Sequence, residues 1–202
     1  LMHVVSSAKF AKKAEEAGCD AIIAEGFEAG GHNGREETTT MCLIPQVVDA
    51  VQVPVVAAGG IADGRSMLAA MVLGASGVQM GSRFVATFES SAHLHFKQSV
   101  IDAQEGDTKL TLKELTPVRL LNNPFADQVK EAYLSHATID ELKTLLGRGR
   151  AKRGMFEGDL IEGELEIGQV SSRMDEIISA RDVVERTIKE MQEIKRKWSG
   201  EL

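Results

Sequence analysis

Four short, mostly apolar segments separated by helical segments constrain the fold of this chain more than any other feature. They lie at residues 2–5, 21–24, 53–58 and 77–80. Apolar residues run along each segment without a regular alternation with polar residues, which is typical of parallel strands covered on both faces. The sequence therefore predicts an α/β fold built on a parallel sheet.

Segments with helical spacing of apolar residues connect these strands. One helix ends before Gly18, a second apolar segment covers 43–51, and a helix over 63–73 ends before Gly74. Two parallel architectures compete for such a pattern. The first strand lacks the Gly-x-Gly-x-x-Gly turn of many doubly wound sheets, and glycine-bearing loops follow the strands, as they do in a barrel. We therefore favour a TIM-barrel type of fold.

The strand and helix alternation stops beyond Phe84. The remainder predicts helices and irregular segments, including a capping box at 138–141 and a helical stripe of apolar residues over 174–194. We expect three regions: 1–88 as the barrel region, 89–170 as a helical cap around the substrate, and 171–202 as a C-terminal helix that packs back on the barrel.

Charge and composition argue against several classes of function. Lys and Arg number 23 against 30 Asp and Glu, a net charge of -7, so we expect no nucleic-acid partner. No apolar run reaches the roughly 20 residues that a membrane-spanning helix needs, and no signal-peptide pattern opens the chain. We therefore expect a cytoplasmic protein with no membrane partner. Cys19 and Cys42 lack metal-ligand spacing, which predicts two buried thiols and no metal site.

A candidate catalytic group follows the second strand. Gly30 and Gly31 allow the backbone to approach a flat ligand closely, and His32 can exchange a proton near neutral pH. A histidine after glycines can also be an ordinary turn residue. Its place in a loop that leaves the C-terminal end of a strand favours the catalytic interpretation, because barrel enzymes keep their catalytic groups there.

Two glycine turns end the third and fourth strands. Gly59 and Gly60 precede a helix, whose N-terminus attracts anions, and Gly81 and Ser82 add a further glycine and a hydroxyl group. A Gly-Gly turn alone can serve simple chain reversal. Two adjacent strands that both end in such loops predict a phosphate-binding site.

Together these motifs resemble the FMN-dependent nitronate monooxygenase family, formerly called 2-nitropropane dioxygenases, whose superfamily includes the flavin-type enoyl-ACP reductases. The segments that carry the resemblance are 24–32, 39–41, 45–47, 57–64 and 77–84, together with Gly158-Asp159, Gly163 and Gly168-Gln169. The resemblance implies a TIM barrel that holds FMN at its C-terminal face beneath a smaller helical domain.

The number of strand and helix units departs from a complete barrel, which has eight in about 250 residues. Four units are recognisable here, and they match the second half of the family. We therefore expect the C-terminal half of a (β/α)8 barrel, with the N-terminal half outside this chain or with another copy, in a homo-oligomer, covering the unpaired strand edges.

The resemblance also implies residue roles. His32 is the expected catalytic residue. The expected contacts of the FMN phosphate are Gly59, Gly60, Gly81 and Ser82, and the expected contacts of the flavin or its ribityl chain are Glu25, Gly31 and Gln79.

Three functions remain open. The first is oxidation of alkyl nitronates with O2 to a carbonyl compound and nitrite. The second is reduction of an enoyl thioester, with NAD(P)H reducing the same FMN; segments 39–41 and 89–93 are closer to this reductase branch, whereas residues 35–37 lengthen the loop after His32. The third is an inactive barrel fragment with a structural role. We place nitronate oxidation first.

Other ionisable residues have simpler interpretations. His3 lies in the first strand and either points into a barrel or packs, with packing favoured. His93 and His95 are two residues apart on an expected helix, which makes a poor metal pair. The basic residues Arg148, Arg150, Lys152 and Arg153 form a solvated loop or, alternatively, a contact for an acidic carrier protein or a nucleotide phosphate.

Overall fold

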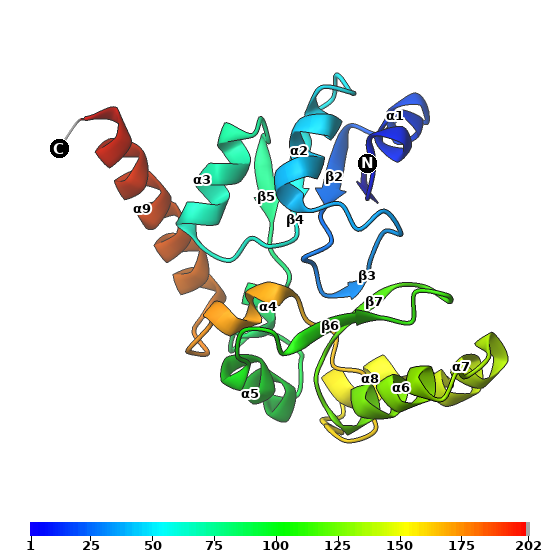
Figure 1. Cartoon of the computed structure of the whole chain (residues 1–202). Coiled ribbons are helices and arrows are strands. Elements are labelled where there is room, and N and C mark those ends of the chain that lie inside the picture. Colours follow the sequence, from blue (N-terminus) through cyan, green and yellow to red (C-terminus); the bar gives the residue numbers. More distant parts are fainter. Residues whose placement is uncertain (201–202) are drawn as a thin grey trace.

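A computed structural model describes residues 1–200 and shows two sheets with helices around them (Figure 1). The elements in chain order are β1 (Met2–Val5), α1 (Ala8–Glu16), β2 (Ala21–Glu25), β3 (Gly31–His32), α2 (Thr40–Val48), β4 (Val55–Ala58), α3 (Gly64–Val72), β5 (Gly77–Gln79), α4 (Ser82–Val85), α5 (Leu94–Asp102), β6 (Thr108–Thr111), β7 (Val118–Leu121), α6 (Pro124–Leu134), α7 (Ile139–Leu146), α8 (Arg150–Met155), the 3-10 helix η1 (Gln169–Arg173) and α9 (Ala180–Ser199).

The first sheet is parallel, as the sequence predicts. Its strand order is β1-β2-β4-β5, and α1, α2 and α3 pack against it. Val5, Ala24 and Ala57 lie in register on the side that packs against these helices. Residues one position further along therefore lie on the opposite side, because side chains alternate along a strand.

Both outer strands of this sheet lack a further partner within residues 1–200. On β1, Met2 and Val4 are 60% and 45% exposed. The described residues thus form an open sheet and no closed barrel. The half-barrel expectation stays a prediction, since four parallel strands with connecting helices are common to barrels and doubly wound folds.

The second sheet was not expected. It is antiparallel, with the order β3-β7-β6, and lies below the parallel sheet in Figure 1. The sequence analysis expected helices and irregular segments here, and that expectation was wrong. All four residues of β7 are buried, so the strand shows no alternation, and β6 and β7 are each only four residues long. A basic residue, Lys109 in β6 and Arg119 in β7, also interrupts each apolar run, which hides the strand signal.

Three apolar clusters hold the molecule together. One lies between the parallel sheet and α1 to α3, the second around Phe96 and Val100 of α5, and the third around Phe125 and Leu142 of α6 and α7. Strand β7 contributes to the last two, because Leu121 belongs to the second cluster and Leu120 to the third. The cap region is therefore packed on both faces of one short strand.

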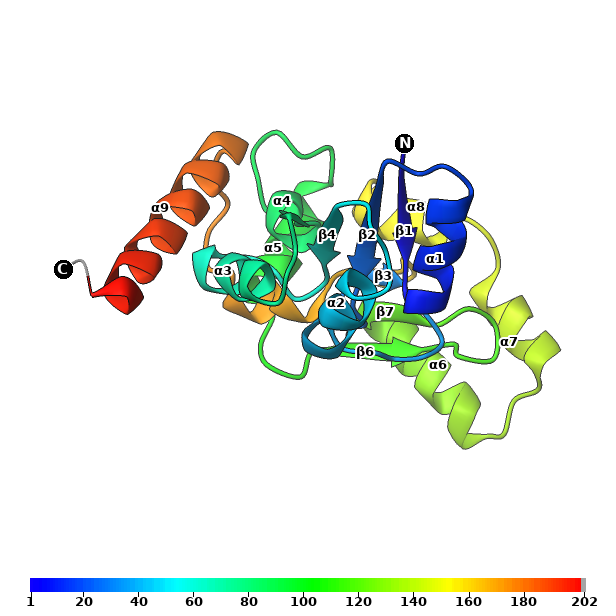
Figure 2. The ribbon, with the colours of Figure 1, turned by 90° about the horizontal axis from the view of Figure 1, so that it is seen from above.

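Helix α9 packs across the N-terminal part of α3 at one end of the molecule (Figure 2). A Cβ at Gly64 would lie 2.3 Å from the backbone nitrogen of Met191, so the glycine permits this close approach. The helix begins at Ala180 rather than at 174, and Val183 is buried while Val184 is 51% exposed. The predicted helical stripe is thus partly wrong. The division into regions 1–88, 89–170 and 171–202 stays a prediction, and its last two residues lie outside the described residues.

The two cysteines and His3 differ in their exposure to solvent. Cys19 is buried as expected, but Cys42 is exposed because it faces outward near the start of α2. His3 is exposed on the edge strand β1 and does not pack in the core. No helix within residues 1–200 combines the length and apolar character needed to cross a membrane. The same residues contain no cluster of three or more His, Cys, Asp or Glu side chains suited to a metal ion.

Candidate active site

A cavity of about 170 Å³ lies at the C-terminal ends of β2, β4 and β5. Glu25 pairs with Ala58, and Ala58 pairs with Gln79, so the three residues form a row across the sheet on the face away from α1 to α3. The residues that line the cavity are Glu25, Glu28, Ala29, Gly30, Ala58, Gly59, Gly60, Ile61, Gln79, Gly81, Ser82, Val85, Met155, Glu166, Ile167, Gly168 and Val170. Six of the eight predicted site residues therefore meet in one place.

The glycine turns present free backbone donors to this cavity. Gly59 and Gly60 have φ values of +87° and +71°, a conformation that favours glycine. A Cβ at Gly59 would lie 2.5 Å from the carbonyl oxygen of Gly26, whereas a Cβ at Gly81 would meet nothing within 4 Å. Within residues 1–200, the N–H groups of Gly59, Gly60 and Gly81 donate to no other group. Adjacent unpaired N–H groups of this kind suit an anion.

The N-terminus of α3 is less available than the sequence suggests. The carboxylate of Asp63 accepts a hydrogen bond of 2.8 Å from the backbone N–H of Ser66, and the N–H of Gly64 donates to the carboxylate of Glu190, also at 2.8 Å. Two carboxylates therefore already occupy the positive end of this helix. The predicted phosphate contact rests on the glycine turns themselves.

The loop after β2 is fastened to its neighbours through Glu28. The carboxylate of Glu28 accepts hydrogen bonds from the backbone N–H and the hydroxyl of Thr40, at 2.9 and 3.0 Å, and its carbonyl accepts one from the N–H of Gln169. The N–H of Gly168 donates to the hydroxyl oxygen of Ser82 at 2.9 Å. The cavity wall thus joins the loops after β2 and β5 to the distant segment before η1.

His32 and Gly31 lie beside the cavity without lining it. They form β3, in which Gly31 pairs with Arg119 and His32 with Val118. The buried guanidinium of Arg119 donates to the carbonyl of Phe27 at 2.8 Å and lies 5.0 Å from the centre of the Phe27 ring. The imidazole of His32 is exposed. Backbone pairing with the cap therefore sets the position of the predicted catalytic histidine.

The sequence did not point to two glutamates, of which Glu164 is buried and Glu166 is half-buried. Glu166 lines the cavity, and Glu164 is only 8% exposed. Burial raises the pKa of Glu166, while a positive charge on His32 opposes this change. Burial, followed by the carboxylate of Glu166, raises the pKa of Glu164 to about 7, and Arg150 opposes the rise. Burial also raises the pKa of Glu25. Perturbed carboxyl groups in a cavity are typical of functional sites.

A pattern that could have revealed these glutamates is present in the sequence. Glu162, Glu164 and Glu166 alternate with Gly163, Leu165 and Ile167. A period of two is the signature of an extended segment with one acidic and one apolar face. Leu165 and Ile167 are indeed buried in the second apolar cluster, which leaves the glutamates on the other face.

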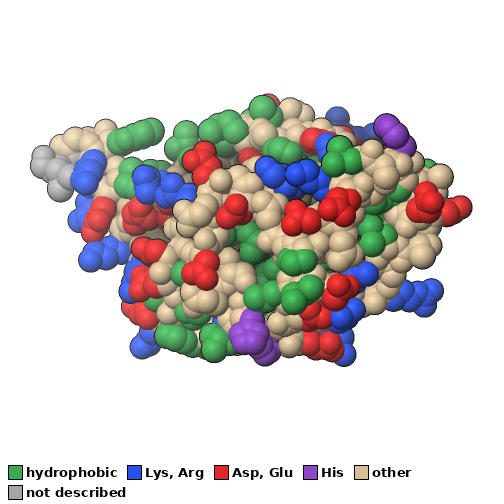
Figure 3. Space-filling view, turned by 60° about the horizontal axis from the view of Figure 1, so that its bottom comes forward, with side chains coloured by type: hydrophobic (Ala, Val, Ile, Leu, Met, Phe, Trp, Pro, Cys, Tyr) green, Lys and Arg blue, Asp and Glu red, His purple; other side chains and the backbone are tan. Residues whose placement is uncertain are grey.

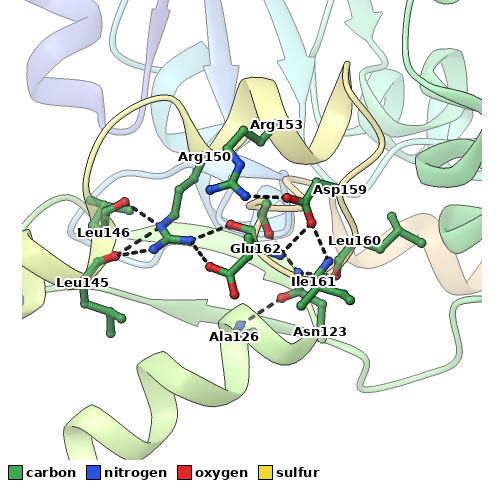
Figure 4. Close-up of polar contacts among 11 residues, drawn as sticks. Asn123, Ala126, Leu145, Leu146, Arg150, Arg153, Asp159, Leu160, Ile161 and Glu162 are labelled. Carbon is green, nitrogen blue, oxygen red and sulfur yellow. Dashed lines mark hydrogen bonds and ion pairs between the residues drawn. The ribbon is translucent and has the colours of Figure 1, made fainter.

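The basic cluster after α7 is partly structural (Figure 4). Arg150 donates to the carbonyls of Leu145 and Leu146 at 2.8 Å, and to the carbonyl of Glu162 at 2.6 Å. Arg153 pairs with Asp159 at 2.6 Å. The expectation of a solvated loop is therefore wrong for Arg150, because its guanidinium links the end of α7 to Glu162. On the face shown in Figure 3, Lys and Arg side chains are interspersed with Asp and Glu.

Comparison with known proteins identifies the family. The family model described as nitronate monooxygenase matches residues 1–190. The chain belongs to the nitronate monooxygenase family. This confirms the resemblance found in the sequence.

Curated relatives from staphylococci support membership in the nitronate monooxygenase family. The protein named "Probable nitronate monooxygenase" from Staphylococcus saprophyticus is 37% identical over 205 residues, which cover 96% of this chain and 57% of that protein. A protein of the same name from Staphylococcus haemolyticus is 47% identical over 127 residues, covering 58% of this chain and 36% of that protein.

Solved structures show the same α/β fold. FabK from Thermotoga maritima has a TM-score of 0.92 and 42% identity, covering 100% of this chain and 63% of that chain. Nitroalkane oxidase from Streptomyces ansochromogenes has a TM-score of 0.76 and 31% identity, covering 98% of this chain and 58% of that chain. This member of the nitronate monooxygenase family thus spans less than two thirds of the length of each of these relatives.

Proposed function

We propose that this chain forms the cofactor- and substrate-facing part of an FMN-dependent oxidoreductase that oxidises alkyl nitronates with O2 to a carbonyl compound and nitrite. The observation that carries the proposal is the meeting of three strand ends, two of them with glycine turns, in one cavity with His32 at its margin. Family membership and the names of the curated relatives support the nitronate as the first candidate substrate.

The residues around the cavity fit the phosphate end of FMN. The unpaired N–H groups of Gly59, Gly60 and Gly81 would hold the phosphate, and Ser82 would add a hydroxyl group. The cavity of about 170 Å³ is smaller than the roughly 300–1,000 Å³ of a typical ligand site, so these residues would hold part of the cofactor. Bound FMN supplies the two-electron redox chemistry.

His32 would act on the substrate from the edge of the cavity. A protonated imidazole stabilises the negative charge of a nitronate, and an imidazole can also donate a proton to a product carbanion. Pairing of β3 with β7 fixes the backbone of His32, so the ring is presented at a constant place. The remaining walls, Glu25 and Gln79 among them, would orient the cofactor and substrate.

Reduction of an enoyl thioester is the second candidate. FabK, an enoyl-ACP reductase, has a higher TM-score and identity than the nitroalkane oxidase, at 0.92 and 42% against 0.76 and 31%. In this alternative NAD(P)H is the reductant and His32 protonates or orients the product. The same residues would serve either reaction.

An FMN titration of the purified chain, followed by visible absorbance, tests the proposal. Bound flavin that is bleached under anaerobic conditions by a nitronate, and not by NAD(P)H, is the expected result. Bleaching by NAD(P)H would favour the reductase instead. If the chain bound no FMN, both enzyme functions would be overturned, and the hypothesis of an inactive barrel fragment with a structural role would stand.

A matched pair of variants tests the phosphate contact. Gly81→Val places a side chain in open space at the cavity wall and should weaken FMN binding more than tenfold. Gly77→Val is the control, because a Cβ at Gly77 also meets nothing within 4 Å and Gly77 does not line the cavity. Equal affinity in the two variants would exclude the predicted phosphate position.

A further inference from the structure

A second cavity, of about 310 Å³, lies beside helix α9. Its walls come from the start of α3, from α4, from the segment after η1 and from α9. It shares no lining residue with the cavity proposed for FMN. Two consecutive residues of α4 show the separation, because Ser82 lines the FMN cavity and Arg83 lines the second one. A ligand in the second cavity would therefore not occupy the place of the cofactor.

Most charged side chains around the second cavity already have partners of opposite charge. Three ion pairs each join an arginine to a carboxylate, and they are Arg173–Asp63 at 2.5 Å, Arg65–Glu190 at 3.5 Å and Arg186–Glu176. Within residues 1–200, the other two charged residues of the lining, Arg83 and Asp175, form no ion pair. Asp175 is exposed, whereas Arg83 is only 8% exposed. Arg83 is therefore a buried positive charge without a carboxylate in contact.

The guanidinium of Arg83 uses only part of its capacity to donate hydrogen bonds. Its Nη2 donates to the carbonyls of Glu176 and Ala86, at 3.1 and 3.5 Å. Its Nε and Nη1 form no hydrogen bond with the rest of residues 1–200. Burial lowers the pKa of Arg83, and the positive charge of Arg186 adds to this, while Glu176 and Asp175 oppose it. A buried charge of this kind is costly unless a partner of opposite charge is supplied.

Thr187 of α9 is a second donor without a partner in this cavity. Its side chain lines the cavity and is only 7% exposed. A threonine inside a helix often donates to the carbonyl four residues before it. The hydroxyl of Thr187 forms no such bond, and no other hydrogen bond within the described part of the chain. Two elements about 100 residues apart, α4 and α9, thus bring unused donors to one cavity.

We propose that this cavity binds the phosphoryl group of a small molecule, to which the Arg83 guanidinium and the Thr187 hydroxyl donate hydrogen bonds. A phosphoryl group carries a charge of about −1.5 to −2 at neutral pH and three acceptor oxygens. It would supply the opposite charge that Arg83 lacks and could accept from α4 and α9 at once. The site is separate from the FMN cavity, so it does not depend on the proposed oxidation of nitronates.

The first test follows Arg83 itself by NMR in the purified, nitrogen-15-labelled chain. The Nε–H signal of Arg83 is assigned by its loss in Arg83→Lys. Titration with inorganic phosphate at constant ionic strength should shift this signal to a plateau, as binding at one site does. Acetate, with one negative charge and two oxygens, should shift the signal much less. An unchanged signal with phosphate, or an equal response to acetate, would overturn the proposed phosphoryl site.

The second test removes one donor and keeps the shape of the side chain. Thr187→Val should weaken phosphate affinity, measured at the Arg83 signal, by about fivefold, because a hydrogen bond to a charged group is lost. Thr144→Val is the matched control, since Thr144 is an exposed threonine of α7 outside the cavity. Equal affinities in the two variants would show that the hydroxyl of Thr187 does not hold the phosphate.

Gly81→Val separates this site from the FMN cavity. The variant changes the wall of the FMN cavity and should leave the phosphate titration of Arg83 as it is. If Gly81→Val abolished the response and Thr187→Val did not, phosphate would bind in the FMN cavity, and the second site would be overturned. A chain that bound no FMN but kept the Arg83 titration would overturn the proposed function alone.

Discussion

The parallel sheet and the antiparallel cap sheet contribute to the candidate site in different ways. The parallel sheet supplies glycine turns and a row of side chains at strand ends, which regular register places together. The cap sheet supplies His32 and the neighbouring Glu166 through pairings with β7, a strand far away in sequence. Under the proposed function, one region would hold the cofactor, and the other brings ionisable groups to the same cavity.

The largest expected effect comes from the cap side. His32→Ala should lower turnover by roughly 10²–10⁴-fold, the usual contribution of a general acid or base, and leave FMN affinity within about twofold. Steady-state kinetics together with a flavin titration check both parts. If His32→Ala bound FMN much more weakly, His32 would belong to the cofactor site. The cap sheet would then also help to hold the cofactor, as the parallel sheet is proposed to do.

The junction between the two regions should be sensitive to a single added side chain. A Cβ at Gly30 would lie 2.3 Å from the backbone carbon of Ile167, and backbone atoms on both sides cannot yield easily. Gly30→Val should therefore lower the free energy of unfolding by on the order of 2–4 kcal/mol. Urea denaturation measures this, with Gly77→Ala as the control. A loss below about 1 kcal/mol would mean that the junction is loosely packed.

Glu164 should make stability depend on pH. Its pKa is about 7 in the folded chain against 4.5 ordinarily, so the folded state holds the proton more tightly. This contribution is complete below about pH 4.5 and is lost as pH rises through 7. The loss should be on the order of 1–2 kcal/mol after allowance for solvent screening.

Chemical denaturation at pH 5 and pH 8 measures the effect of Glu164. Glu164→Gln should reduce the difference between the two pH values, because the neutral amide cannot lose a proton. Glu105→Gln, which removes one exposed negative charge, should preserve the difference. If the pH dependence of stability were unaltered in Glu164→Gln, it would come from other groups, such as Glu25 and Glu166, whose pKa values are also raised.

The smallest expected effect lies on the parallel-sheet side. Thr40→Val removes a hydroxyl group that lies 3.0 Å from Oε2 of Glu28 and 2.8 Å from the carbonyl of Gly59. The free energy of unfolding should fall by about 1 kcal/mol, and FMN affinity should fall by several-fold because the turn at Gly59 loses its support. Thr40→Ser, which keeps the hydroxyl, is the matched control. Unchanged stability and FMN affinity in Thr40→Val would show that the hydroxyl group does not support the turn.

The two regions were predictable to different degrees. The strands at 2–5 and 77–79 and the capping box at 138–141 follow from local apolar patterns and capping residues, which act over a few neighbours. Strand β7 could not be found this way, because Arg119 interrupts its short apolar run and is buried only through tertiary contacts. The predicted stripe of α9 is half-buried at Ile188 and Met191 but exposed at Val184, because apolar spacing alone does not say which neighbour covers a helix.

Some residues of the candidate site could likewise be predicted from the sequence, and others could not. The glycine turns and His32 stood out in the sequence because glycine and histidine are chemically distinctive residues after apolar strands. Glu166 did not, because a glutamate in a charged, glycine-rich stretch resembles a solvated residue until the fold buries it. Its raised pKa comes from burial, which no local pattern reports.

The sequence by itself determined the parallel strands, the glycine turns at their ends and membership in the nitronate monooxygenase family, because these depend on local residue types and short spacings. Only the tertiary structure decided that His32 is held by β7 beside the cavity, that Glu166 pairs with Leu120 of the same strand, and that α3 already has carboxylates at its N-terminus. These features join segments distant in the chain, and long-range pairing and burial create the contacts that give such residues their chemistry.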